Sequence, residues 1–203
     1  MRSIGLTGGI ASGKSTVTKT LAEHGAVIID ADLLGHETYE PGTDTFRKVV
    51  DAFGSDIVAA DGTIDRKVLG GKVFGQPDGM TRLTDVVWPG IRALAEARLS
   101  ELAAEGAEVA ILEAAVMIEA GWQDLVDEVW VITVPPEVAR ERLMERNGLS
   151  AEDADNRISS QLSNDERIKH ADVVISTDCP LAEVTDRVDE AWAALQQRIT
   201  AGS

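Results

Sequence analysis

Two observations predict an α/β fold with a five-stranded parallel sheet flanked by helices. Short apolar runs alternate along the 203 residues with longer segments of helical periodicity, which is the pattern of a parallel sheet with crossover helices. The apolar runs are rich in Val and Ile and nearly continuous, as expected of strands that are buried on both faces. A chain of this length is expected to form a single domain with room for an insertion.

The expected strands and helices follow from these runs in order. We expect strands at Ser3–Thr7, Ala26–Asp30, Glu108–Leu112, Glu128–Val134 and Asp172–Ser176. We expect helices at Lys14–His24, Thr43–Phe53, Arg66–Phe74, Met80–Ala104, Pro136–Asn147, Ala151–Leu162 and Leu181–Ile199. Residues 31 to 107, between the second and third strands, are too many for one crossover helix. They predict a helical insertion.

The charge balance argues against two classes of partner. Lys and Arg number 19 and Asp and Glu 35, so the net charge of −16 attracts neither nucleic-acid phosphates nor an anionic membrane surface. The longest apolar runs, such as Val129–Val134, fall far short of the ~20 residues that a membrane-spanning helix needs. Glycines interrupt the N-terminal apolar residues, and the single Cys179 excludes a disulfide within the chain. We expect a cytoplasmic protein with no nucleic-acid, membrane or obligate protein partner.

The sequence GGIASGKS over Gly8–Ser15 fits the phosphate-binding pattern G-x-x-x-x-G-K-[ST] between a predicted strand and a predicted helix. Successive backbone N–H groups and the helix N-terminus would bind anionic oxygens. We expect Lys14 to contact the β- and γ-phosphates, Ser15 to bind Mg²⁺, and Thr16 to support the phosphates.

The alternative is a Gly-rich helix start with a solvated lysine. The pattern predicts a P-loop nucleoside triphosphate hydrolase fold. Its nucleotide-binding residues would be Gly8, Gly9, Ile10, Ala11, Ser12, Gly13, Lys14, Ser15 and Thr16.

Two carboxylates, Asp30 and Asp32, follow the second strand, where ligands of parallel α/β sheets bind. A carboxylate there could accept the proton of an attacking hydroxyl or reach Mg²⁺ through water. Either residue could instead cap a following helix, which is a favoured role of Asp. We expect one of the two carboxylates to be structural, which leaves the other for a catalytic role.

Arg142 and Arg146 lie four residues apart and share one face of a predicted helix. Over a γ-phosphate, these arginines would stabilise transition-state charge and exclude water. They could equally form solvated pairs with nearby glutamates. Glu113, at the end of the third strand, could hold a Mg²⁺-bound water or could be a buried acid paired with a base.

Several further motifs carry a resemblance that covers essentially the whole chain. They are GLTGGI at residues 5–10, IIDAD at 28–32, Pro41-Gly42, DGTIDR at 61–66, Val73-Phe74, RNGLS at 146–150, Arg157, Gln161 and Ala171-Asp172. Together with the P-loop, they resemble dephospho-coenzyme A kinase.

The resemblance implies ATP-dependent phosphorylation of the 3′-hydroxyl of dephospho-coenzyme A, the last step of coenzyme A biosynthesis, with Mg²⁺. It implies one kinase domain over residues 1–203. This comprises a core at 1–30, 108–135 and 171–203, a substrate-binding insertion at about 31–107 and a lid at about 136–170. It also implies that Asp32, Lys14 and Arg146 are catalytic. Dephospho-coenzyme A would contact Thr7, Asp32, Arg66 and Trp88. Arg66 could instead cap a helix, and Trp88 could simply pack.

Some segments depart from the usual bacterial pattern of this family. Trp88-Pro89-Gly90-Ile91 replaces H-P-x-I, and His36 stands where an arginine is common. The segments at 87–89, 119–123 and 127–130 resemble the kinase domain of eukaryotic bifunctional coenzyme A synthase. The chain is therefore expected to be a stand-alone kinase of that subtype or an excised domain.

Two alternatives remain on the residues alone. The first is another P-loop small-molecule or nucleotide kinase, which would differ in its acceptor pocket. The second is a GTPase-type switch, because Asp51–Gly54 spells D-x-x-G. That segment lies in a helical pattern, and no N-K-x-D guanine motif follows it.

Overall fold

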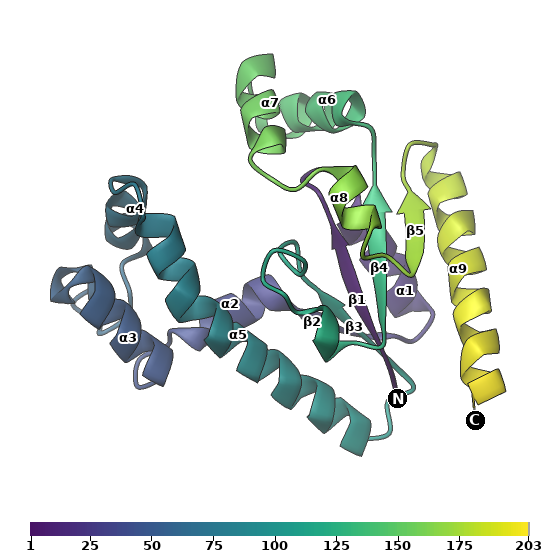
Figure 1. Cartoon of the computed structure of the whole chain (residues 1–203), viewed down its shortest axis with the longest axis horizontal. Coiled ribbons are helices and arrows are strands. Elements are labelled where there is room, and N and C mark those ends of the chain that lie inside the picture. Colours follow the sequence, from purple (N-terminus) through teal and green to yellow (C-terminus); the bar gives the residue numbers. More distant parts are fainter. Residues whose placement is uncertain (203) are drawn as a thin grey trace. The chain divides into compact units, whose positions relative to one another are not determined.

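The computed structural model describes residues 1–202, which form a five-stranded sheet and a set of helices (Figure 1). The strands are β1 Arg2–Gly8, β2 Val27–Asp30, β3 Val109–Glu113, β4 Glu128–Thr133 and β5 Val173–Ser176. The helices are α1 Lys14–Glu23, α2 Ala31–Thr38, α3 Asp44–Phe53, α4 Arg66–Phe74, α5 Gly79–Ala104, α6 Pro136–Asn147, α7 Ala151–Ser159, α8 Asn164–Ile168 and α9 Leu181–Gly202. Within this described part, no helix combines the length and the apolar character needed to cross a membrane.

The strand order is β2-β3-β1-β4-β5, with β1 parallel to both β3 and β4, and β4 parallel to β5. This confirms the predicted five-stranded parallel sheet. The order places the carboxyl end of β1, where the P-loop begins, at the centre of the sheet. Ligands of parallel sheets bind at this carboxyl edge.

The expected elements agree with the structure to within a few residues, except at two helices. α2 was not expected, because it begins directly after β2 with no connecting turn. The expected helix Ala151–Leu162 ends at Ser159, and the short α8 follows it. The break has a local cause, since the Ser163 side chain accepts a hydrogen bond from the Glu166 amide and starts a new helix.

One face of the sheet is covered by α1 and α9. Ile4 and Leu6 of β1, Ile111 of β3 and Ile132 of β4 are buried against apolar residues of these two helices. The helical residues are Val17, Leu21, Val184, Val188 and Leu195. Because this packing fixes α1 against β1, it also fixes the loop that joins them.

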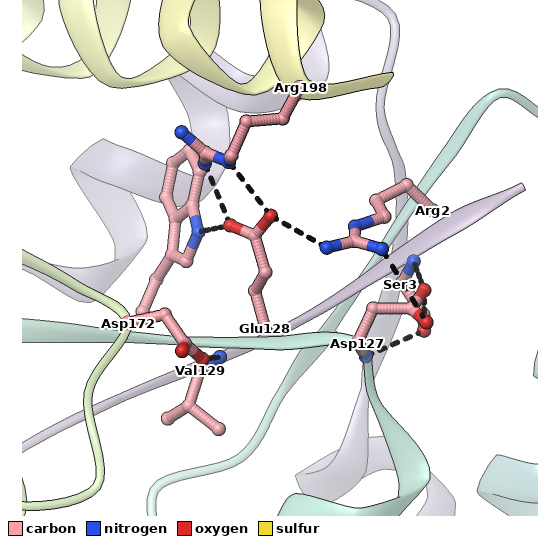
Figure 2. A network of polar contacts seen from close by, with 8 residues as sticks. Arg2, Ser3, Asp127, Glu128, Val129, Asp172 and Arg198 are labelled. Atoms are coloured by element: carbon pink, nitrogen blue, oxygen red, sulfur yellow. Dashed lines mark hydrogen bonds and ion pairs between the residues drawn. The ribbon is translucent and has the colours of Figure 1, made fainter. Parts of the chain in front are cut away.

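The amino edge of the sheet holds a network of charged side chains around Glu128, the first residue of β4 and only 5% exposed (Figure 2). The Glu128 carboxylate accepts hydrogen bonds from Arg2 (3.1 Å), from Arg198 of α9 (2.8 and 3.0 Å) and from the Trp130 indole (3.1 Å). Burial alone would raise the pKa of Glu128. The hydrogen bonds from Arg198, Trp130 and Arg2 outweigh burial and lower that pKa below its ordinary value.

The chain divides into two compact units. The first comprises Met1–Ile29 and the chain from Glu101 onward, and it contains the sheet. The second, Asp30–Ser100, is helical. Inside it, the Arg82 guanidinium lies 5.1 Å from the centre of the Phe53 ring. The assignment of core, substrate-binding insertion and lid to these segments stays a prediction.

Candidate active site

The loop between β1 and α1 needs glycine at both of its ends. A Cβ on Gly8 would lie 2.5 Å from the backbone oxygen of Ile132, so the loop leaves the sheet in close contact with β4. Gly13, the residue before α1, has a φ of +87°, which glycine adopts without steric cost. These two positions shape the turn that brings the N-terminus of α1 to the carboxyl edge of the sheet.

The Lys14 side chain folds back over this loop. Its Nζ donates to the carbonyl oxygens of Gly8 (2.8 Å) and Gly9 (3.4 Å). Residues 11 to 16 line a cavity of about 660 Å³. The other residues that line it are Glu113, Arg142, Glu145, Arg146, Thr177, Cys179, Leu181 and Val184. The cavity therefore has cationic groups beside the P-loop and apolar groups from the start of α9.

Arg142 of α6 is bonded to the P-loop directly and through Thr177. Its guanidinium donates to the Ala11 carbonyl (3.2 Å), the Thr177 hydroxyl (3.0 Å) and the Thr177 carbonyl (2.7 Å). The Thr177 hydroxyl in turn donates to the Ser12 carbonyl (2.7 Å). Arg146, on the same helix, is exposed, and its Nε donates to Asn147 Oδ1 (3.0 Å). Arg142 is thus built into the site, while Arg146 lies at the border of the cavity.

Oxygen ligands for a divalent cation are present in the same cavity. Ser15 lies exposed in the first turn of α1, and the Glu113 carboxylate accepts a hydrogen bond from the Thr18 hydroxyl (2.7 Å). Residues 1–202 contain no group of three or more His, Cys, Asp or Glu that could hold a metal. One hydroxyl and one carboxylate suit Mg²⁺, which binds through few protein oxygens and completes its shell with phosphates and water.

A second cavity of about 430 Å³ adjoins the P-loop, with Gly9, Ile10 and Ser12 in its wall. Gln161 and Arg167, from the segment after α7, also line it. Arg167 is 1% exposed and pairs with Glu119 at 3.1 Å. Burial lowers the pKa of Arg167, and the charge of Glu119 offsets part of that effect.

In the second unit, Asp30 and Asp32 have different environments. Asp30 Oδ1 accepts hydrogen bonds from the amides of Asp32 (2.8 Å) and Leu33 (3.3 Å), so Asp30 is the N-cap of α2. Asp32 lies exposed in the first turn of that helix.

Arg66, the first residue of α4, donates to His36 Nε2 (3.1 Å), and its guanidinium lies 5.9 Å from the centre of the Tyr39 ring. Asp65, rather than Arg66, caps α4. Trp88 is half-buried inside α5, next to Pro89.

Comparison with known proteins identifies the family. A model described as CoaE, dephospho-CoA kinase, matches residues 2–183. The chain belongs to the dephospho-CoA kinase family. A dephospho-CoA kinase of Geobacter sulfurreducens is 47% identical over 193 residues, which cover 95% of this chain and 98% of that protein. These matches do not test the resemblance to eukaryotic bifunctional coenzyme A synthase, which stays a prediction.

Solved structures support the same family and the wider fold. A dephospho-CoA kinase from Campylobacter jejuni superposes with a TM-score of 0.74 at 27% identity, with all of both chains covered. A shikimate kinase from Acinetobacter baumannii superposes with a TM-score of 0.54 at 17% identity, covering 98% of this chain and 94% of that one. The second likeness shows a shared P-loop kinase fold only.

Within this dephospho-CoA kinase family member, the structure gathers part of the predicted set at one place. Residues 11 to 16 share the larger cavity with Arg142, Arg146 and Glu113. Thr7 is different, because it is fully buried and donates to the Ala115 carbonyl at 3.3 Å. The binding and catalytic roles of all these residues, and of Asp32, Arg66 and Trp88 in the second unit, stay predictions.

The sequence analysis missed Thr177 and noted Gln161 only among the residues that carry the family resemblance, although both are bonded to the P-loop. Thr177 could have been found, because it directly follows β5 at the carboxyl edge of the sheet. Gln161 gave no chemical signal, since a glutamine beyond a helix end is ordinary in a surface segment.

Proposed function

We propose that this chain transfers the γ-phosphoryl group of ATP to the 3′-hydroxyl of dephospho-coenzyme A, giving coenzyme A and ADP. One observation carries the proposal: a complete P-loop opens onto a cavity of about 660 Å³ in a chain that matches the dephospho-CoA kinase model over residues 2–183. This reaction is the final step of coenzyme A biosynthesis.

The residues that line the larger cavity suit the two parts of ATP. Residues 11 to 16 supply backbone amides and the α1 N-terminus, which favour phosphate oxygens. Cys179, Leu181 and Val184 supply an apolar surface that suits a purine base. Bound in this direction, the nucleotide places its γ-phosphate beside Lys14 and near the β1 carboxyl end.

Lys14, Arg142 and Arg146 then stabilise negative charge on the phosphates. Arg142 is already held beside Ala11 by its contact with the loop carbonyl. Arg146 is exposed and can change its rotamer, so it can approach the transferred group once both substrates are bound. Cations placed where charge develops account for most of the rate enhancement in phosphoryl transfer.

Mg²⁺ fits the Ser15 hydroxyl and the Glu113 carboxylate, the second through a water molecule. When bound, it neutralises phosphate charge. Thr18 holds the Glu113 carboxylate by a 2.7 Å hydrogen bond and so fixes its orientation.

On the acceptor side, Asp32 takes the proton of the attacking 3′-hydroxyl as a general base. Its exposed position leaves the carboxylate open to a substrate, whereas Asp30 is used as a helix cap. Thr7, Arg66 and Trp88 are proposed contacts of dephospho-coenzyme A. A cytoplasmic location and the lack of nucleic-acid or obligate protein partners stay sequence-based predictions.

The test is ADP release from ATP with and without dephospho-coenzyme A, beside adenosine, shikimate and nucleoside monophosphates as acceptors. We expect release to require dephospho-coenzyme A and to fall when GTP replaces ATP. Equal turnover with shikimate or a nucleoside monophosphate would assign the chain to another class of P-loop kinase. Hydrolysis that prefers GTP and ignores every acceptor would favour a nucleotide switch.

A further inference from the structure

The P-loop contains a strained residue at its tip. Ala11 has a φ of +58°, and it is the one non-glycine residue with a positive φ between residues 1 and 202. A Cβ makes this left-handed conformation unfavourable, so it persists only where surrounding contacts hold it. Within the loop, the Ser12 amide donates to the Gly9 carbonyl across Ala11 (3.2 Å), and groups outside the loop add further contacts.

Three hydrogen bonds from outside the loop hold the backbone before, at and after Ala11. The Ile10 amide donates to Gln161 Oε1 (2.8 Å), Arg142 donates to the Ala11 carbonyl (3.2 Å), and Thr177 donates to the Ser12 carbonyl (2.7 Å). The bonds to the Ala11 and Ser12 carbonyls are linked to each other, because Arg142 also donates to the Thr177 hydroxyl. Gln161 is independent of this pair and acts on the other side of the strained residue.

Packing gives the loop little support on the side of Gln161. The cavity of about 430 Å³ lies there, with Gly9 and Ile10 in its wall. Buried in that wall, Ser12 Oγ lacks a hydrogen-bond partner among the described residues. A loop that borders a cavity is held by its polar contacts more than by close packing.

Gln161 is itself well anchored. The backbone N–H of Gln161 donates to the Ile158 carbonyl at the end of α7 (3.2 Å). The next residue, Leu162, accepts a hydrogen bond through its carbonyl from Arg167, which is 1% exposed and paired with Glu119 at 3.1 Å. The side-chain amide of Gln161 therefore extends to the P-loop from a fixed segment of backbone.

We propose that Gln161 is a positioning residue for the phosphoryl-transfer site. It acts through the Ile10 N–H and holds the P-loop in the left-handed conformation at Ala11 that receives the phosphates. The proposal rests on the proposed function only in taking ATP as the ligand of this loop. Without Gln161, a smaller fraction of free protein has the competent loop, and the apparent Kd for ATP rises by the inverse of that fraction.

The first variant is Gln161→Met, which keeps the length of the side chain and removes its amide oxygen. We expect the Kd for Mg²⁺-ATP, measured by calorimetry without acceptor, to rise about 3- to 10-fold, the effect of one lost hydrogen bond. The KM for ATP should rise in parallel, while kcat at saturating ATP stays within about twofold, because bound nucleotide selects the competent loop again. Gln197→Met, an exposed glutamine of α9, is the matched control and should leave both constants unchanged.

The second variant, Ala11→Gly, separates positioning from general damage. Glycine adopts a positive φ freely, so the loop needs less external support. We expect the double variant Ala11→Gly/Gln161→Met to regain most of the ATP affinity that Gln161→Met alone loses. The double-mutant cycle then shows coupling between the two positions. The amide signal of Ile10 in ¹⁵N NMR should shift in Gln161→Met and not in Gln197→Met.

The proposal is overturned if Gln161→Met leaves the Kd for ATP unchanged, or if Ala11→Gly fails to reduce its effect. If Gln161→Met strongly lowers the melting temperature, a second variant, Gln161→Glu, takes its place because it keeps an acceptor oxygen. An Ile10 amide signal like that of the wild type in Gln161→Glu supports the proposal, and a shifted signal overturns it. A wild-type protein that binds ATP but does not phosphorylate dephospho-coenzyme A would refute the proposed function alone, because the affinity cycle needs no acceptor.

Discussion

The two edges of the sheet use charged side chains in opposite ways. At the amino edge, two arginines and an indole donate to the buried Glu128 carboxylate, so charges of opposite sign neutralise one another inside the fold (Figure 2). At the carboxyl edge, Arg142 donates to a backbone carbonyl of the P-loop and to Thr177, and Lys14 donates to the carbonyls of Gly8 and Gly9. The oxygens that Arg142 contacts are all neutral.

This difference in partners means that the charged groups of one edge contribute mainly to stability and those of the other mainly to ligand binding. A cation paired with a carboxylate stabilises the folded chain and has little attraction left for a ligand. Arg142, which is oriented by neutral oxygens, keeps most of its charge for an incoming phosphate. The comparison therefore predicts that substitutions at the carboxyl edge reduce turnover with little loss of stability, and that substitutions at the amino edge do the reverse.

Asp30 and Asp32 show the same contrast between a stabilising and a ligand-binding charge within three residues of sequence. Substitution of Asp32 should give the largest loss of turnover. Asp32→Asn is expected to lower kcat by about 10²–10⁴-fold, the usual contribution of a general base, and to leave ATP affinity largely intact. Asp30→Ala is the control, because it removes a helix cap worth about 1 kcal/mol of stability. Steady-state kinetics and thermal unfolding measure the two quantities. A larger loss of kcat in Asp30→Ala would exchange the two roles.

Lys14→Ala tests the carboxyl edge directly. Removing a cation that offsets charge on the transferred phosphoryl group should lower kcat by about 10²–10³-fold. The melting temperature should stay close to that of the wild type. Lys19→Ala on the same helix is the control, because its side chain is exposed and pairs only loosely with Glu23 at 3.8 Å. A folded Lys14→Ala protein with near-normal turnover would contradict the assignment of the site.

Arg146→Ala is expected to have a smaller effect, because this side chain is exposed and reaches the phosphates only after a rotamer change. Loss of a charge-assisted hydrogen bond that is strongest in the transition state should lower kcat by about 10- to 100-fold, with a smaller change in ATP affinity. Arg146→Lys should recover part of the loss, since an ammonium lacks the planar two-point contact.

The control for this variant is Arg140→Ala, whose guanidinium on the same helix pairs with Asp155 at 3.4 Å. Kinetics of all three variants provide the comparison. If Arg146→Ala and Arg146→Lys both keep the wild-type kcat, the arginine belongs to a solvated helix face.

At the amino edge, Glu128→Gln should change stability and leave kcat unaltered. Losing the charged acceptor is expected to cost about 1–3 kcal/mol at pH 7, towards the lower end because both arginine partners are partly exposed. The pKa of Glu128 is lowered in the folded protein, so its contribution is complete above the unfolded pKa of about 4.3 and is lost as pH falls through the folded pKa.

Urea unfolding of the wild type and Glu128→Gln between pH 7 and pH 3 measures this contribution. The stability difference should be constant at the upper end of that range and should shrink below about pH 4. A difference that does not depend on pH would show that packing, and not charge, is what Glu128 contributes.

Most of the strand–helix order, the P-loop and the candidate Asp pair could be predicted from the sequence, because each has a local signal. Buried strands are apolar runs, the P-loop is a contiguous pattern, and an Asp before a helix is a recognised cap. Local signals failed at α2 and α8, where a strand runs straight into a helix and where a helix of five residues is too short to show periodicity.

Tertiary structure alone decided which distant side chains hold the nucleotide loop and which neutralise one another. Gln161 contacts Ile10 across 151 residues of sequence, and Thr177 contacts Ser12 across 165. At the other edge of the sheet, Arg198 is bonded to Glu128 across 70 residues. Such contacts exist only after the sheet has formed and brought its edges and connecting segments together. Hydrogen bonds between distant segments leave no periodic pattern in the sequence of either segment. The local sequence around a glutamine or arginine that makes such a bond is therefore no different from the sequence around one that faces water.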